Sequence, residues 1–223
     1  MTDTISDAPA PQTIDEDATD IRDRLIRIAA RHFAEHGFQG ASQRAIQREM
    51  GVPNSTVNYY FGSKEGLYCA VLEQALSRIQ STRISGFNEI PAGISQHEHV
   101  RALMRAYLGA HLREAGNETG YNYLRIVASL HLVVPDVAVG LLQERVAPVR
   151  ELYVDALAKL FPNASRNRIY EMLSLTVGLA ALAPFRFGAP QLSEKTINRM
   201  IDEVVTISTA AFETHCNINE DDD

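Results

Sequence analysis

The chain has 223 residues, which is long for one domain and short for two large ones, so we expect one main core and a small additional unit. Its hydrophobic content of 45% is ordinary for a globular protein, but no run of about 18 apolar residues occurs, so we expect no membrane contact. The acidic beginning M-T-D-T-I-S-D is unlike a secretory signal, and two cysteines are too few for a disulfide framework. We therefore predict a cytoplasmic protein.

The formal net charge of −7 is distributed unevenly along the sequence. The segments 1–19 and 217–223 together contain nine acidic residues and no Lys or Arg, which leaves a net charge of +2 for the residues between them. We interpret both segments as disordered acidic tails, because highly charged termini rarely join a packed core. The overall acidity therefore does not argue against a nucleic-acid partner.

The first predicted helix starts at Asp20, where apolar residues begin to recur at every third or fourth position. Gly37 and Gly40 end this pattern. Ser42 is a suitable N-cap for a short second helix, Q-R-A-I-Q-R-E-M, which ends at Gly51.

A short third helix is predicted over 54–61, N-S-T-V-N-Y-Y-F, after the turn G-V-P. Gly62 ends it, and Ser63 can cap a fourth helix that continues to about Ser85. Two short helices joined by a glycine-containing turn form a helix-turn-helix pattern.

The order of these elements is more specific than the pair of short helices alone. A longer helix with an H-G-F ending precedes the capped short helix, the G-V-P turn, the aromatic-rich helix and the sequence F-G-S-K-E. The residues that carry this order are Phe33, Gly37, Phe38, Ser42, Ile46, Gly51, Val52, Thr56, Val57, Tyr60, Phe61, Gly62, Ser63, Lys64 and Glu65. With them, residues 21–72 resemble the DNA-binding domain of the TetR family of transcriptional regulators. The resemblance implies an all-helical, usually homodimeric protein with a divergent C-terminal ligand domain.

The rest of the chain has helical periodicity but no comparable motif. Five further helices are predicted at about 96–115, 119–134, 136–160, 166–184 and 193–214. Pro148 should kink or divide the third of these. We thus predict an all-α fold of about nine helices, with a three-helix helix-turn-helix domain at 20–66 and a larger effector-binding and dimerisation domain at 67–216.

Base contacts are expected from the outer face of the third helix. Val57 and Phe61 lie four residues apart and should face the core, so the opposite face can enter the major groove, where asparagine pairs with adenine. The candidates for this face are Asn54, Ser55, Asn58 and Tyr59. Either asparagine could instead cap the helix or contact a phosphate. Asn54 and Ser55 replace a lysine and a glycine common in the family, so the operator of a better-known member cannot be transferred.

Phosphate contacts are expected from residues at helix starts. Ser42 and Lys64 occupy such positions, where free backbone amides favour an anion. The resemblance implies a phosphate contact for Tyr60 as well. Arg44 and Arg48 lie one turn apart on the second helix, and we retain Arg44 as a DNA candidate, whereas Arg48 fits an exposed surface better.

A small-molecule site is expected between the fourth and the last helices, because polar and aromatic residues occur there among apolar ones. The candidates are Arg105, Tyr107, His111, Tyr123, Arg125, His131 and Arg186. Taken singly, each also fits a satisfied or surface side chain. The resemblance implies that a small, largely apolar effector releases the DNA, and that the helices near 166–184 and 193–214 form the homodimer.

No enzymatic activity and no cofactor are expected, because the sequence contains no nucleophile elbow, phosphate loop or H-E-x-x-H motif. Two alternatives remain open, a helical adaptor without an effector and a metal-sensing regulator. The metal ligands would be His97, His99, His111, His131 and Cys216, although H-x-H on a helix directs its two rings to different faces. The favoured interpretation is a ligand-responsive regulator that binds a palindromic DNA operator as a dimer. Repression is favoured because a dimer on an operator blocks polymerase without further machinery.

Overall fold

The computed structural model describes residues 13–189 and 191–217, and within them the chain forms ten α-helices, two 3-10 helices and no strand. The α-helices are α1 (Thr13–Gly40), α2 (Gln43–Met50), α3 (Thr56–Phe61), α4 (Lys64–Asn88), α5 (Gln96–Leu112), α6 (Glu118–Leu130), α7 (Asp136–Arg145), α8 (Ala147–Leu160), α9 (Arg166–Leu182) and α10 (Glu194–Cys216). The 3-10 helices are η1 (Arg113–Gly116) and η2 (Ala183–Phe187). The predicted all-α fold is confirmed.

One segment differs from the sequence-based expectation, and a second divides as Pro148 predicted. Residues 13–19, assigned to a disordered tail, belong to α1, which begins at Thr13. The predicted helix at 136–160 is two helices, because Pro148 lies at the start of α8 and lacks the N–H that a continuous helix needs. The remaining tail residues, 1–12 and 218–223, lie outside the described part of the chain.

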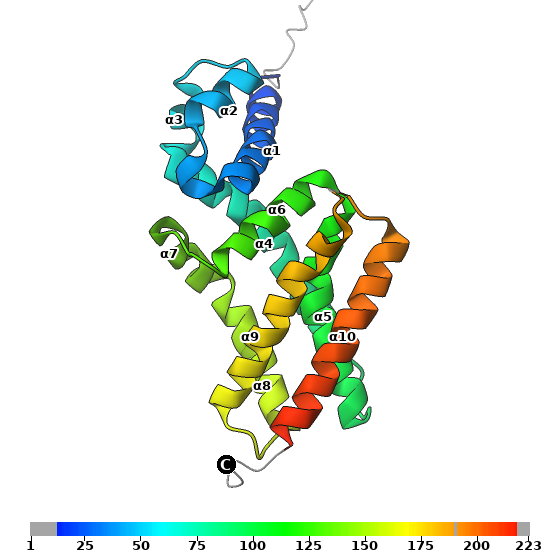
Figure 1. The fold of residues 1–223 in the computed structure, drawn as a ribbon. Helices are drawn as coiled ribbons and strands as arrows, with labels where there is room; N and C mark the ends of the chain where they lie inside the picture. Colours follow the sequence, from blue (N-terminus) through cyan, green and yellow to red (C-terminus); the bar gives the residue numbers. More distant parts are fainter. Residues whose placement is uncertain (1–12, 190, 218–223) are drawn as a thin grey trace, which may run out of the picture.

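The three N-terminal helices pack around a small core of their own. Leu25, Ile26 and Phe33 of α1 are buried with Ile46 of α2 and Val57 of α3. In Figure 1 this unit lies at one end of the molecule, and α4 leaves it to enter the larger helical part. The proposed domain boundary after residue 66 therefore falls inside α4, a helix shared by both parts.

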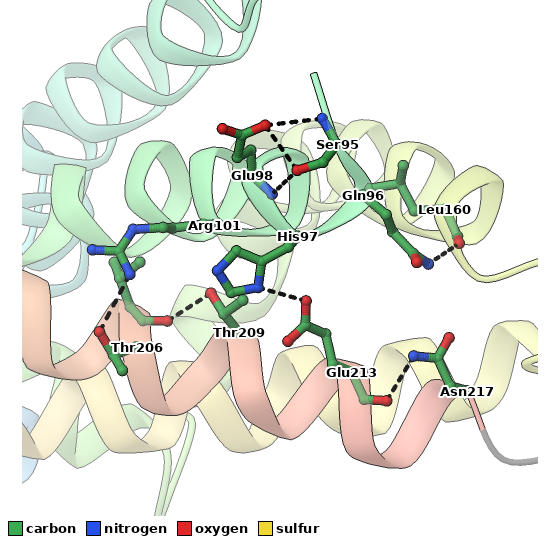
Figure 2. A network of polar contacts seen from close by, with 11 residues as sticks. Ser95, Gln96, His97, Glu98, Arg101, Leu160, Thr206, Thr209, Glu213 and Asn217 are labelled. Atoms are coloured by element: carbon green, nitrogen blue, oxygen red, sulfur yellow. Dashed lines mark hydrogen bonds and ion pairs between the residues drawn. The ribbon is translucent and has the colours of Figure 1, made fainter. Parts of the chain in front are cut away.

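The larger part is a bundle in which α5 lies alongside α10, and α9 runs beside α10 (Figure 1). Polar contacts tie the start of α5 to the end of α10, as Figure 2 shows. There the imidazole Nδ1 of His97 lies 2.7 Å from Oε1 of Glu213, and Arg101 donates to Thr206. Ser95 and Glu98 form a reciprocal capping box at the start of α5, which fixes where this helix begins. The face of α10 that packs on α5 is therefore covered.

Candidate functional site

The helix-turn-helix is built by local capping. Ser42 caps α2 by accepting a hydrogen bond from the backbone N–H of Ala45 at 3.3 Å, as its position predicted. Gly51 ends α2 with φ 74° and ψ 28°, a left-handed conformation that side chains disfavour. The buried side chain of Gln47 donates from Nε2 to the carbonyl of Asn54 at 2.7 Å, which fixes the turn. Gln47 was not identified from the sequence, although its position next to the inward-facing Ile46 indicates a buried side chain.

The expected reading residues are all exposed, but they belong to two different elements. Because α3 begins at Thr56, Asn54 and Ser55 lie in the turn before it rather than on its first helical turn. Asn58 is on the exposed face of α3, where its Oδ1 accepts a hydrogen bond from Nε2 of Gln43 at 3.0 Å. Tyr59 is 82% exposed, the most exposed tyrosine in the described chain. A tyrosine this exposed contributes little to the core and is available to a partner.

Tyr60 and Lys64 lie at the junction of α3 and α4 and are partly buried. The ring of Tyr60 meets that of Tyr59 edge to face, with centroids 4.9 Å apart. The Lys64 ammonium donates to the backbone carbonyl of Gln39 at 3.2 Å and lies 4.9 Å from the centre of the Phe38 ring. Because an ammonium has three donors, this arrangement positions the charge and leaves hydrogen atoms for an anion.

The exposed side chains of Arg44 and Arg48 add positive charge to α2. Ser42, which precedes them, is also exposed. The surface formed by the start of α2, the turn, α3 and Lys64 therefore combines hydroxyls, amides and three cationic side chains. We call it the α2–α3 surface.

Close packing fixes α3 against α4. A Cβ added to Gly66 of α4 would lie 1.9 Å from the carbonyl oxygen of Phe61, the last residue of α3. Only glycine therefore permits this approach. The α2–α3 surface is thus rigidly connected to the helix that continues into the larger part.

A cavity of about 190 Å³ lies inside the larger part. Its walls come from α4, α5, α6, α7 and α9 and are mostly apolar. The lining residues that carry the later argument are Gln80, Arg83, Tyr107, His111, His131 and Val134. An apolar cavity with few polar groups is the usual form of a small-molecule site.

One end of the cavity is polar and deeply buried. Arg83 is 6% exposed, and it donates from Nε to the carbonyl of Tyr107 at 2.9 Å and from Nη1 to Oε1 of Gln80 at 3.3 Å. Its guanidinium carbon lies 3.8 Å from the centre of the Tyr107 ring. Burial, aided by the nearby charges of Arg83 and His131, lowers the pKa of His111 to about 3, so that this imidazole is neutral at physiological pH.

The cavity reaches the surface at the segment between α6 and α7. His131 and Val134 line the cavity and are exposed, whereas Arg83 and His111 are buried. In the same segment Leu132 and Val133 are 86% and 72% exposed. An apolar mouth therefore leads to the polar end.

Four of the seven predicted pocket residues line this cavity, namely Tyr107, His111, Tyr123 and His131. The three arginines do not. Arg105 pairs with Asp202 and Arg186 pairs with Glu203, both acidic residues of α10, because surface carboxylates lie nearer to them than the cavity does. Arg125 lies on α6, half-buried and away from the cavity lining. Arg83 and Gln80 were missed, although Arg83 continues the apolar stripe of Leu76 and Ile79 at helical spacing.

The proposed metal ligands do not come together. Within residues 13–189 and 191–217, no three His, Cys, Asp or Glu side chains are grouped as a metal site requires. His97 instead pairs with Glu213. In the same residues, no helix is long and apolar enough to cross a bilayer.

Apolar side chains also gather on the outer faces of α9 and α10. Leu175, Leu179 and Leu182 recur on α9 and are 67%, 37% and 65% exposed, and Ile207 of α10 is 55% exposed. We call this set the α9–α10 face. Large exposed apolar side chains that recur along a helix are typical of protein interfaces.

Two family models match the chain and decide its family. Residues 25–71 match the model described as "Bacterial regulatory proteins, tetR family", which covers the helix-turn-helix. Residues 95–211 match "Tetracyclin repressor-like, C-terminal domain", which is more than half of the chain. The chain belongs to the TetR family.

Curated relatives match over part of the chain. The HTH-type transcriptional repressor AcnR of Corynebacterium glutamicum is 33% identical over 61 residues, which are 27% of this chain and 32% of AcnR. The HTH-type transcriptional regulator BetI of Vibrio campbellii is 29% identical over 81 residues, 36% of this chain and 40% of BetI. The matches thus span about a third of these relatives, all of which are named as regulators of transcription.

Two solved structures resemble the fold of this chain over most of its length. The ketosteroid transcriptional regulator KstR2 of Mycobacterium tuberculosis superposes with a TM-score of 0.64 at 17% identity, covering 85% of this chain and 93% of KstR2. The fatty acid degradation regulator FadR of Bacillus halodurans gives a TM-score of 0.57 at 16% identity, covering 91% of this chain and 97% of FadR. At these identities the likeness concerns the fold.

Proposed function

We propose that this protein is an effector-responsive transcriptional repressor that binds a palindromic DNA operator as a homodimer. The observation that carries the proposal is the α2–α3 surface, where exposed asparagines and Tyr59 surround the turn and cationic groups flank them. The family and the printed names of the relatives support this function. Repression follows if the bound dimer excludes polymerase from the operator.

DNA contacts in this proposal divide by chemistry. Asn54, Ser55, Asn58 and Tyr59 face the base edges. Ser42, Arg44, Tyr60 and Lys64 bind phosphates and set the register of the motif. Oδ1 of Asn58 accepts from Gln43 and has a second lone pair for the adenine amino group, so the contact with Gln43 can orient Asn58 for pairing with adenine.

Dimerisation in this proposal buries the α9–α10 face against its copy. A two-fold axis positions the two α2–α3 surfaces so that each enters one of two successive major grooves, which are about 34 Å apart along B-DNA. Burial of Leu175 and Leu182 supplies the apolar area. One α2–α3 surface alone would bind its half-site too weakly to recognise an operator.

Signal transfer in this proposal runs through α4. This helix carries Lys64 at its first position and Gln80 and Arg83 in the cavity wall. A ligand that favours one position of α4 changes the spacing of the two α2–α3 surfaces, and affinity for DNA changes by the same coupling free energy. We assign 20–66 to DNA binding and 67–216 to effector binding and dimerisation, with α4 shared.

Footprinting of the purified full-length protein on DNA that flanks its own gene tests this proposal. We expect a protected segment with two-fold symmetry and half-sites about one helical turn apart. Replacing Tyr59 and Asn58 by Ala should abolish the footprint while circular dichroism stays unchanged. A helical adaptor would instead leave all DNA unprotected, and asymmetric protection by a monomer would contradict the dimer.

A further inference from the structure

Arg83 is a buried charge without a counter-ion in the described chain. It is 6% exposed, yet no carboxylate of residues 13–189 and 191–217 lies within ion-pair distance of its guanidinium. Glu114 pairs instead with Arg78, another arginine of α4. An arginine cannot lose its proton at physiological pH, so the charge persists inside the protein. Buried charges are otherwise paired or strongly destabilising.

The contacts that Arg83 does make compensate only part of this charge. Its partners are a backbone carbonyl, an amide oxygen and the face of the Tyr107 ring. These groups interact with the guanidinium through dipoles or a quadrupole, and none carries a negative charge. Two of its three nitrogens are used, and Nη2 has no hydrogen bond to the described residues. This nitrogen is available to a ligand in the cavity.

Two further polar atoms beside Arg83 lack partners. Nε2 of Gln80 and Nε2 of His111 are buried, line the cavity through their side chains and make no hydrogen bond in the described chain. The amide nitrogen is a donor, and the neutral imidazole becomes one when its proton is on Nε2. Buried donors are nearly always satisfied in folded proteins. Two buried donors without partners therefore line the same cavity as the free Nη2 of Arg83, and together these groups complement an anionic group with several acceptors.

We propose that the effector is a carboxylic acid whose carboxylate pairs with Arg83 and accepts hydrogen bonds from Gln80 and His111. This inference depends on the proposed function in one respect only, which is that the ligand is called an effector. A carboxylate fits these donors because one of its oxygens can accept a charge-assisted hydrogen bond from Nη2 of Arg83, which leaves lone pairs for Gln80 and His111.

The cavity size restricts the rest of the molecule. A cavity of about 150 Å³ in another protein takes up benzene. The volume of about 190 Å³ therefore suits one ring or a short acyl chain with its carboxylate. The apolar body lies toward Val134 and the exposed segment between α6 and α7, and the carboxylate lies at the buried end. Larger tails must extend through this mouth.

The position of Arg83 links this recognition to the DNA-binding end. The residue is on α4, and its backbone carbonyl accepts a hydrogen bond from the Tyr153 hydroxyl of α8 at 2.7 Å. A carboxylate at Arg83 therefore acts directly on the helix that carries Lys64.

Calorimetric titration of the full-length protein without DNA tests the inference. The ligands are matched pairs of acid and amide, namely benzoate with benzamide, 3-phenylpropanoate with 3-phenylpropanamide, and hexanoate with hexanamide. We expect at least one acid to bind about tenfold or more tightly than its amide, as charge-assisted hydrogen bonds imply. Arg83→Met should remove this preference, and Arg83→Lys, which keeps the charge, should retain part of it.

Arg105→Met is the matched control, because this arginine pairs with Asp202 outside the cavity. It should keep the preference for acids. The inference is overturned if the amides bind as well as the acids, if no acid binds at millimolar concentration, or if both Arg83 variants keep the full preference while circular dichroism shows them folded. Failure of DNA binding would contradict the proposed function alone, since the titrations contain no DNA.

Discussion

Lys64 is held in place before any DNA arrives. Its ammonium is fixed between the Gln39 carbonyl and the Phe38 ring, so that little side-chain entropy remains to be lost on binding a phosphate. The family resemblance already implied a phosphate contact here, and the hydrogen bond explains why a single lysine can be effective.

Lys64→Ala should weaken binding to all duplex sequences and lower the slope of log K against log salt by about 0.9, the value for one lost phosphate contact. Fluorescence anisotropy with random duplex DNA at several salt concentrations measures this slope. Lys159→Ala, which removes an exposed lysine of α8, is the control and should leave the slope unchanged. An unchanged slope in Lys64→Ala would reject the phosphate contact.

His111 should make the protein sensitive to acid. Its pKa is about 3 in the folded protein and about 6.5 when unfolded, so the unfolded chain binds the proton between these values. Its neutral form contributes stability above the unfolded pKa, and this contribution is lost as the pH falls toward the folded pKa.

His111→Gln removes this dependence. Between about pH 6 and pH 4, the free energy of unfolding of the wild type should fall relative to the variant by about 1.4 kcal/mol per pH unit. Urea titrations at each pH measure the difference, and His36→Gln, an exposed histidine of α1, should follow the wild type. Parallel curves for wild type and His111→Gln would show that His111 is not held neutral.

At the scale of elements, the junction of α3 and α4 is the tightest part of the motif. Gly66→Ala places a methyl group against the Phe61 carbonyl, so we expect a loss of about 1 to 3 kcal/mol in stability and weaker DNA binding. Gly140→Ala is the control, because no atom lies within 4 Å of its added Cβ, and it should stabilise α7 by about 1 kcal/mol. Thermal unfolding and anisotropy give both quantities. Equal behaviour of the two variants would mean that α4 shifts freely relative to α3.

Helix positions could be predicted because their signals are local. The caps Ser42, Ser63 and Ser193 and the break near Pro148 depend on residues within one turn of the chain. The start of α1 was missed because residues 1–19 were assigned to a disordered tail on their acidic composition alone. A charged segment can still be helical, as residues 13–19 are.

The cavity could be predicted only in part, because its polar end depends on packing between distant helices. Arg83 meets the carbonyl of Tyr107 from α5 and the hydroxyl of Tyr153 from α8, and neither partner is near it in sequence. Arg105 and Arg186 were chosen because they lie among apolar residues, but acidic residues of α10 hold both at the surface.

At the scale of the whole molecule, the α9–α10 face should hold two copies together. Replacing Leu175 and Leu182 by Glu puts charges into the interface, so the mass in solution should fall from twice the chain mass of 24.7 kDa to that mass. Light scattering after gel filtration measures the mass in solution. The affinity for the operator should fall when the dimer dissociates. Leu132→Glu is the control, a leucine outside this face that is even more exposed. A dimer that survives the double substitution would place the interface elsewhere.

The central claim is that the α2–α3 surface reads a palindromic DNA sequence. Selection of bound fragments from a pool of genomic DNA by the full-length protein tests it most directly. We predict that one palindromic motif is enriched by the wild type, and that Asn54→Ala with Asn58→Ala abolishes or changes the motif. Enrichment of no motif by the folded wild type, or of the same motif by both proteins, would contradict the account.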